Sequence, residues 1–256
     1  MKLSVVMPVY NEERTLREIV GRVLAQPFDI ELVLVDDGSK DRSREIMAEL
    51  ACEHPQIRCI HHEQNKGKGG ALSTGFREVR GDVVVIQDAD LEYDPADYPT
   101  LLAPIQDGRA QVVYGSRFLR TPVRKIHSFW HTLGNRVLTL MSNMFTDLYL
   151  TDMETCYKAM TSDVARRLDI QSRTFAVEPE MTAKIAKMDV VVYEVPISYA
   201  GRGYHEGKKI GIKDAFIAFW AIVRWRFAPT PPPAPASKSL PSAPAPAQPN
   251  EAPLDS

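Results

Sequence analysis

The stretch VVVIQDADLEYDP, residues 83–95, decides the fold. Its first four residues, Val83 to Ile86, are all β-branched, as is typical of a strand buried on both faces of a parallel sheet. Asp88 and Asp90 follow, and along an extended chain their side chains point to the same side. Two carboxylates held that close need a partner, and Mg²⁺ or Mn²⁺ prefers such oxygen ligands. Taken alone, an Asp-x-Asp more often only ends a strand or caps a helix, so the neighbouring segments must decide.

Upstream of this stretch, apolar strands alternate with amphipathic helices. We predict strands at residues 3–9, 30–35 and 57–62, and helices at 13–25, 43–52 and 71–79. This alternation indicates an α/β fold, a parallel sheet covered by helices. In open sheets of this kind, ligands bind beyond the carboxyl ends of the strands. The polar clusters at 10–12, 36–39 and 88–90 all follow strands, which favours a metal site at Asp88 and Asp90.

Two basic segments near predicted strand ends are candidate phosphate sites. In Lys66–Gly70 (KGKGG) the glycines could let backbone N–H groups approach a phosphate, with Lys68 beside them, or the segment could be a flexible loop with solvated lysines. It matches neither the Walker A nor the G-x-G-x-x-G pattern. Arg117 follows a predicted strand at 111–114, where an arginine could neutralise a phosphate or form a surface ion pair.

Two apolar segments of the C-terminal half are too short to span a bilayer. Residues 126–150 are apolar on more than one face, which suits a helix at a membrane surface or partner interface, and equally a core helix. Residues 212–228 place Trp220 and Trp225 among lysines and arginines, which favours an amphipathic helix at an anionic membrane interface over a helix docked on the catalytic domain. Residues 229–256 are rich in Pro, Ala and Ser, so we predict a disordered tail.

The overall composition limits the partners and the compartment. The chain has 256 residues, and its formal net charge of −2 gives no global attraction to nucleic acid. Its three scattered cysteines are typical of reduced thiols, and His127 and His131 lack a zinc-binding context. The N-terminus resembles neither a signal peptide nor an anchor. We therefore expect a cytoplasmic protein, peripheral on the cytoplasmic face of a membrane, that binds no nucleic acid.

Eight segments, taken together and in order, resemble the family 2 glycosyltransferases, within them the dolichol-phosphate (polyprenyl-phosphate) mannosyltransferase-like branch. They are VVMPVYNEE (5–13), LVDDGS (34–39), NKGKGGAL (65–72), DADLE (88–92), YGSRF (114–118), TDMETCYK (151–158), EVP (194–196) and GKKIG (207–211). The resemblance covers about residues 1–215. It implies the GT-A fold over residues 1–211, a mainly parallel nucleotide-binding sheet flanked by helices, followed by the interface helix and the tail.

The resemblance also implies roles for individual residues. Asp88, Asp90 and Arg117 would act in catalysis, the two aspartates by carrying Mg²⁺ or Mn²⁺ on a diphosphate. Some relatives use a glutamine two residues after the second Asp as a further metal ligand; Glu92 stands there in this chain, and its ligand role stays open. The implied contacts to the nucleotide, sugar and phosphates are Pro8, Tyr10, Glu12, Asp37, Lys68, Arg117, Arg202 and Lys208.

The activity implied by the resemblance is inverting transfer of a sugar from GDP-mannose, UDP-glucose or UDP-N-acetylglucosamine to a polyprenyl phosphate. A phosphate acceptor is ionised at neutral pH and needs no general base, whereas a sugar hydroxyl in polysaccharide synthesis would need one. Asp152 and Glu154 are the candidates for that base. The two apolar segments favour the lipid acceptor. A nucleotide-sugar pyrophosphorylase is disfavoured because MPVYNEE (7–13) contains no glycine-rich loop.

Overall fold

The structure is a computed structural model that describes residues 1–119, 128–174, 176–201 and 212–229, without the side chains of 212–215. The predicted site residues Arg202 and Lys208, together with His127 and the tail from residue 230, lie outside the described residues. None of the described helices combines the length and the apolar character that crossing a bilayer would require.

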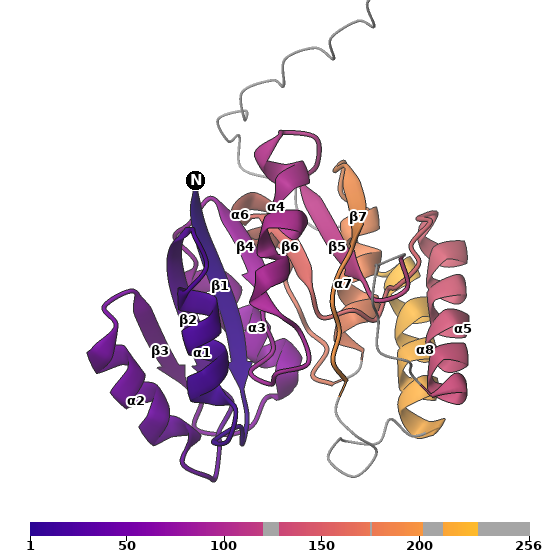
Figure 1. The fold of residues 1–256 in the computed structure, drawn as a ribbon. Coiled ribbons are helices and arrows are strands. Elements are labelled where there is room, and N and C mark those ends of the chain that lie inside the picture. The colour runs from indigo at the N-terminus through magenta and orange to yellow at the C-terminus, as the bar shows by residue number, and fades with distance from the viewer. Residues whose placement is uncertain (120–127, 175, 202–211, 230–256) are drawn as a thin grey trace, which may run out of the picture.

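A single sheet organises the described part of the chain, with seven strands in the order β3-β2-β1-β4-β6-β5-β7 (Figure 1). Strand β6 (Lys158–Thr161) is antiparallel to both of its neighbours, and the other pairs are parallel. The parallel strands are β1 (Lys2–Val9), β2 (Asp29–Asp36), β3 (Ile57–His61), β4 (Val83–Ile86), β5 (Val112–Ser116) and β7 (Val192–Pro196). The predicted mainly parallel α/β sheet is thus confirmed, while β6 was not predicted. Because β6 is reversed, the residues before it reach the edge where β4 and β5 end.

Helices cover both faces of the sheet. In Figure 1, α1 (Leu16–Leu24) and α4 (Tyr98–Gln106) lie in front, and α3 (Gly67–Glu78) lies behind. The remaining elements are α2 (Ser43–Glu53), the 3₁₀ turn η1 (Pro95–Asp97), α5 (Phe129–Thr146), α6 (Ser162–Arg167), α7 (Val177–Ala186) and α8 (Ile212–Phe227). Helices α5, α7 and α8 pack on one another beside β7. The core lies between these layers; the VVVI run of β4 is fully buried, as predicted.

The glycine-rich segment 66–70 is part of α3, which begins at Gly67, rather than a loop before a helix at 71–79. The glycines of this segment pack closely against residues 171–173. A Cβ on Gly67 would lie 1.9 Å from the carbonyl oxygen of Arg173, and one on Gly69 would lie 1.7 Å from that of Ser172. Only glycine lets the two backbones approach this closely.

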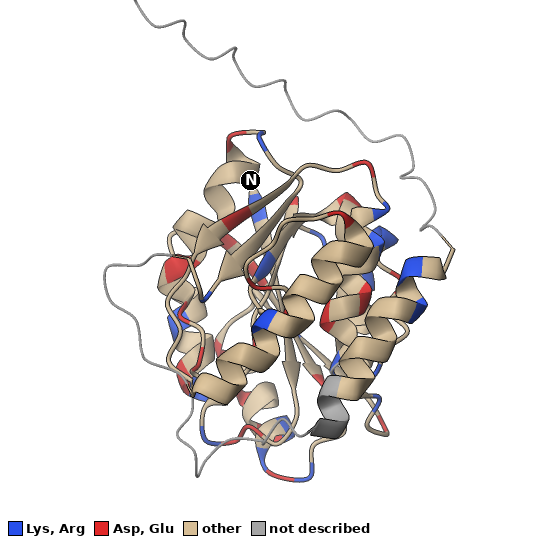
Figure 2. Cartoon of the chain, turned by 90° about the vertical axis from the view of Figure 1, so that its right-hand side faces the viewer, with Lys and Arg blue, Asp and Glu red and all other residues tan. Residues whose placement is uncertain are grey.

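Helix α5 buries a row of polar side chains and exposes most of its large apolar ones. Asn135, Thr139 and Ser142 share one face, and all three are buried. The apolar side chains on the opposite side are exposed: Phe129, Trp130, Leu133, Val137, Leu140 and Met144. Helix α8 exposes Phe216, Ile217, Phe219, Trp220 and Phe227 on one side. Its other side is docked on the rest of the domain, so the predicted interfacial position of Trp225 is wrong: this side chain is 5% exposed and its indole N–H donates to the hydroxyl of Ser172. In Figure 2 both helices face the viewer and carry few charged residues. Leu138, Met141 and Phe145 pack against the core, so residues 126–150 combine the contacts of a core helix with an exposed apolar side, and contact of that side with a membrane or a partner stays a prediction.

Candidate active site

The two aspartates of the Asp-x-Asp motif lie where β4 ends, as predicted. Asp88 pairs with Lys68 at the start of α3, with 3.0 Å between Oδ1 and Nζ, and Lys68 also lies 3.2 Å from Oε1 of Glu178 on α7. Burial opposes the charge on Lys68, but Asp88 and Glu178 raise its pKa well above the usual value. Oδ1 of Asp90 accepts the N–H of Glu92 at 3.0 Å, which fixes the turn after the motif. Lys68 thus holds a positive charge beside the candidate metal carboxylates.

The motif residues fit a divalent cation that is shared with a ligand. Asp88 and Asp90 are both half-buried and open to solvent on one side. Among the described residues, no group of three or more His, Cys, Asp or Glu side chains forms a metal cage. Mg²⁺ commonly binds one or two carboxylates and completes its shell with water and substrate phosphates, so two carboxylates suffice. The carboxylate of Glu92 accepts a hydrogen bond from the hydroxyl of Tyr199 at 2.7 Å, so its predicted metal contact stays a prediction.

The residues predicted to hold the base and ribose lie at or just after the ends of β1 and β2. Tyr10 is 45% exposed, and Pro8, inside β1, is half-buried. The carboxylate of Glu12 accepts the hydroxyl of Thr15 at 2.9 Å, and this hydroxyl also lies 2.9 Å from the carbonyl oxygen of Ala89. The start of α1 is therefore tied directly to the Asp-x-Asp loop.

Asp37 is buried and anchors the start of α3. Its carboxylate accepts the N–H groups of Lys66 and Gly67, both at 2.8 Å, and lies 2.8 Å from Nδ1 of His62. The two amides are among the unsatisfied donors at a helix N-terminus, so a carboxylate stabilises them. This position accounts for Asp37 structurally, and its contact with a nucleotide stays a prediction.

Arg117 follows β5 and is held by Asp152 from the segment before β6. The side chain is 9% exposed; Nε lies 2.7 Å from Oδ2 of Asp152 and Nη2 lies 2.8 Å from Oδ1. Burial opposes both charges, but each partner stabilises the other, so the pKa of Arg117 is raised and that of Asp152 is lowered. The ring of Tyr199 lies 5.1 Å from the guanidinium. Arg117 is thus no surface ion pair, because its partner is fully buried.

Two further residues of this region, Asn135 and His131 on α5, were not predicted as site residues. Nδ2 of Asn135 donates to Oδ1 of Asp152 at 3.2 Å. Burial, and then the charge of Arg117, lowers the pKa of His131. The sequence carries no signal for either, since they belong to the polar stripe of a predominantly apolar helix.

Glu154 lies two residues after Asp152 and is half-buried. In the part of the chain that the structure describes, its Oε1 is a buried oxygen without a hydrogen-bond partner. Burial, and then the charge of Glu178, raises the pKa of Glu154 to about 8. At neutral pH this carboxyl is protonated, so it can donate a hydrogen bond but is a poor general base.

Solved structures share this fold. Glucosyl-3-phosphoglycerate synthase from Mycobacterium tuberculosis, in complex with Mn²⁺, UDP and phosphoglyceric acid, is similar with a TM-score of 0.66 over 89% of this chain and 79% of that chain. The same enzyme with Mn²⁺, UDP and glucosyl-3-phosphoglycerate has a TM-score of 0.64. The sequence identities are 18% and 19%, so these likenesses show the fold alone, which is the GT-A fold of glycosyltransferases.

Sequence comparison then gives the family. The profile described as "Glycosyl transferase family 2" matches residues 4–166, and the chain belongs to this family. The dolichol-phosphate mannosyltransferase of Pyrococcus furiosus is 30% identical over 88% of this chain, which spans 64% of that protein. The undecaprenyl-phosphate mannosyltransferase of Micrococcus luteus is 30% identical over 89% of this chain and 95% of its own length. The UDP-N-acetylglucosamine–dolichyl-phosphate N-acetylglucosaminyltransferase of Methanococcus voltae is 29% identical over 86% and 94% of the two chains.

Proposed function

We propose that the protein transfers a sugar from a nucleotide-diphosphate sugar to a polyprenyl phosphate at a membrane surface, with inversion at the anomeric carbon. The relatives in three organisms are named for transfer to dolichyl or undecaprenyl phosphate, which supports this acceptor class. Their names differ in the sugar, so GDP-mannose, UDP-glucose and UDP-N-acetylglucosamine all stay candidates.

The observation that carries the proposal is the double role of helix α5. On its buried side, Asn135 bonds to the Asp152 carboxylate that holds Arg117. On its other side, Leu140 and Met144 are 60% and 74% exposed. A phosphate at Arg117 would therefore lie next to a helix whose free face suits the acyl boundary of a bilayer. A lipid phosphate needs this combination, and a soluble acceptor does not.

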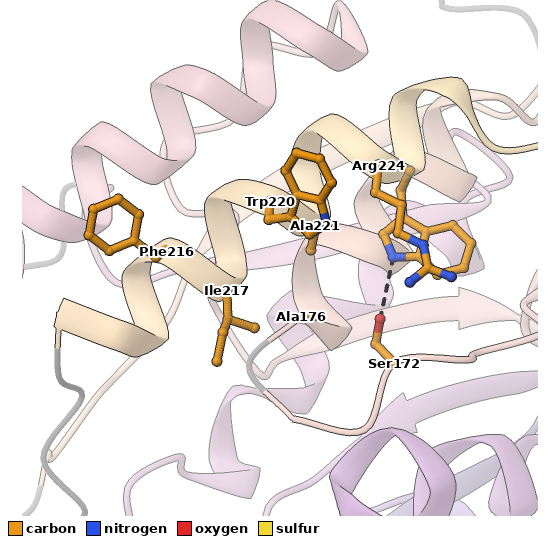
Figure 3. A pocket seen from close by; sticks show the side chains of 8 residues that line it. Ser172, Ala176, Phe216, Ile217, Trp220, Ala221 and Arg224 are labelled. Carbon is orange, nitrogen blue, oxygen red and sulfur yellow. Dashed lines mark hydrogen bonds between the residues drawn. The ribbon is translucent and has the colours of Figure 1, made fainter.

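Helix α8 supports the same placement. A cavity of about 330 Å³ lies between α8 and the segment leading into α7, lined mainly by apolar side chains such as Ile217 and Trp220 (Figure 3). Arg224 lies at this cavity as well. Exposed aromatic side chains next to arginine suit the headgroup region of an anionic membrane. We propose that α5 and α8 rest on the cytoplasmic face of the membrane.

The residues of the site fit a displacement reaction. A divalent cation at Asp88 and Asp90, Mg²⁺ or Mn²⁺, would stabilise the negative charge that builds on the leaving nucleoside diphosphate. Lys68, charged and beside Asp88, can donate to the same phosphates. Arg117, oriented by Asp152, would hold the acceptor phosphate. That phosphate is ionised at neutral pH and attacks the anomeric carbon without a general base.

Transfer to a sugar hydroxyl is the second candidate, and the state of the two predicted bases disfavours it. Both oxygens of Asp152 are bonded to Arg117, which lowers its pKa. The pKa of Glu154, at about 8, keeps this carboxyl protonated at neutral pH. Neither is suited to accept a proton from a hydroxyl.

The test is transfer of label from a panel of radioactive nucleotide sugars into organic-extractable lipid, with polyprenyl phosphate and Mg²⁺ or Mn²⁺. We expect label in the lipid with one donor, lost with a chelator and in Asp90→Ala. Asp82→Ala, at the opposite end of β4, is the matched control and should keep the activity, because its carboxylate contacts only the amide of Lys2 at 2.8 Å in the hydrogen bonds of the described residues. If the donor is hydrolysed but no lipid is labelled, the lipid acceptor is wrong.

A further inference from the structure

The carboxylate of Glu194, on strand β7, is bonded to the segment that precedes β6. Its Oε1 accepts the N–H groups of Thr151 and Asp152, both at 3.0 Å. Its Oε2 accepts the hydroxyl of Thr151 at 2.9 Å and also lies 3.0 Å from the Thr151 nitrogen. This one carboxylate therefore fixes both peptide groups that lead into Asp152.

A chain of hydroxyl groups carries the same anchor to the end of β5. The hydroxyl of Thr151 donates to Glu194, so it must accept from the hydroxyl of Ser116, which lies 2.6 Å away. The Ser116 oxygen in turn accepts the N–H groups of Phe118 and Leu119, at 3.1 and 3.2 Å. Each hydroxyl group in this series therefore donates in one direction only, toward the carboxylate of Glu194.

Arg117 lies between these two anchored segments. Its backbone N–H donates to Oδ2 of Asp152 at 3.0 Å, in addition to the two side-chain contacts. Glu194 fixes the backbone of Asp152, whose carboxylate holds the guanidinium, and, through Thr151, the hydroxyl of Ser116, the residue before Arg117. It does so without being close enough to Arg117 for an ion pair in the described residues.

We propose that Glu194 is a positioning residue, which sets the orientation of Arg117 through Asp152 and through the Thr151–Ser116 hydroxyl pair. Its effect on activity rests on the proposed function, because it requires that Arg117 contacts a phosphate. Its effect on the geometry of Arg117 does not. A displacement of about 1 Å in a group that binds the reacting phosphate costs up to about a hundredfold in rate.

The matched control is Glu31 on β2. Its carboxylate also accepts a hydroxyl group and a backbone N–H, but near the amino ends of β1 and β2. Its buried Oε1 accepts the hydroxyl of Ser4 at 2.6 Å and the N–H of Arg80, and the Ser4 oxygen accepts the N–H of Gly81 at 2.8 Å. Loss of either carboxylate leaves donors without their partner and destabilises the fold. Only loss of Glu194 should affect Arg117.

The test compares Glu194→Ala, Glu194→Gln and Glu31→Ala by hydrogen exchange and by transfer kinetics. We expect faster amide exchange at Arg117 and Phe118 in Glu194→Ala but not in Glu31→Ala. We expect kcat/KM for polyprenyl phosphate to fall about ten- to a hundredfold in Glu194→Ala. Glu194→Gln should recover part of this, because its amide oxygen can keep the two backbone contacts, while its NH₂ group cannot accept from the hydroxyl of Thr151.

Two outcomes would overturn the proposal. One is unchanged amide exchange at Arg117 in Glu194→Ala. The other is that Glu194→Ala lowers kcat/KM by the same factor in the wild-type protein and in Arg117→Lys. A residue that acts through Arg117 should lose its effect when Arg117 is altered. If the wild-type protein labels no lipid, the proposed function fails, and the exchange measurement still decides the role of Glu194.

Discussion

The exposed side of α5 predicts how tightly the protein binds vesicles. We consider Leu140→Ser/Met144→Ser, a double substitution of side chains that are 60% and 74% exposed and four residues apart. Full burial of such a side chain is worth about 1.5–3 kcal/mol, so the exposed fractions correspond to about 2–4 kcal/mol for the pair. Every 1.4 kcal/mol is tenfold in affinity, so the double variant should bind about 30- to 700-fold more weakly.

The assay is co-sedimentation with vesicles that contain anionic lipid, at several lipid concentrations. The control is Val191→Ser, since Val191 is 50% exposed and precedes β7, outside α5 and α8. The free energy of unfolding should change little in either variant, because the substituted side chains are mostly in solvent. Equal vesicle binding by the double variant and the wild type would refute the membrane placement of α5, whatever the result for lipid labelling.

Three further predictions concern stability. Asp152→Asn leaves buried Arg117 without its counter-charge and should cost about 3–5 kcal/mol in urea unfolding, against less than about 1 kcal/mol for Glu78→Gln in a more exposed pair; similar costs would contradict the buried pair. Because the pKa of Glu154 is raised from 4.5 to about 8, the folded state keeps a proton that the unfolded state releases, so the free energy of unfolding should fall as pH rises between these values. Glu154→Gln should flatten that fall in urea titrations at about pH 5, 7 and 9, and an unchanged slope would exclude Glu154 as its source. Gly69→Ala should lower the melting temperature because its Cβ would lie 1.7 Å from a backbone oxygen, while Gly134→Ala, with nothing within 4 Å, should raise it slightly; equal effects would rule out the close packing at α3.

The sequence was sufficient for the parallel strands because most of them contain a short apolar run, such as VVVI in β4 and LVLV in β2. It was insufficient for β6, which reads KAMT over residues 158–161 and begins with a lysine. Lys158 is fully buried there and its ammonium donates to carbonyl oxygens of the preceding segment. A lysine that is buried because backbone carbonyl oxygens accept its hydrogen bonds cannot be recognised from a hydrophobic pattern.

The candidate site was predictable where it depends on strand ends and unpredictable where it depends on long-range contacts. Asp88 and Arg117 follow strands, so sheet geometry places them at one edge. Arg117 and Asp152 are 35 residues apart, and Glu194 and Asp152 are 42 residues apart. Helix or strand periodicity cannot predict contacts over such separations. Likewise, the periodicity of α5 shows that it is amphipathic but not that its polar side is the buried one.

The candidate site lies at the carboxyl ends of the parallel strands, which leaves their amino ends available for attachment. The turns that lead into β5 and β7, around Asp107 and Asp189, lie at the amino ends of these strands and are exposed. A fluorophore or an immobilising linker attached at either turn would lie at the end of its strand opposite the Asp-x-Asp motif. The protein could therefore be tethered to a chip by these turns, with α5 and α8 left free to meet a supported bilayer.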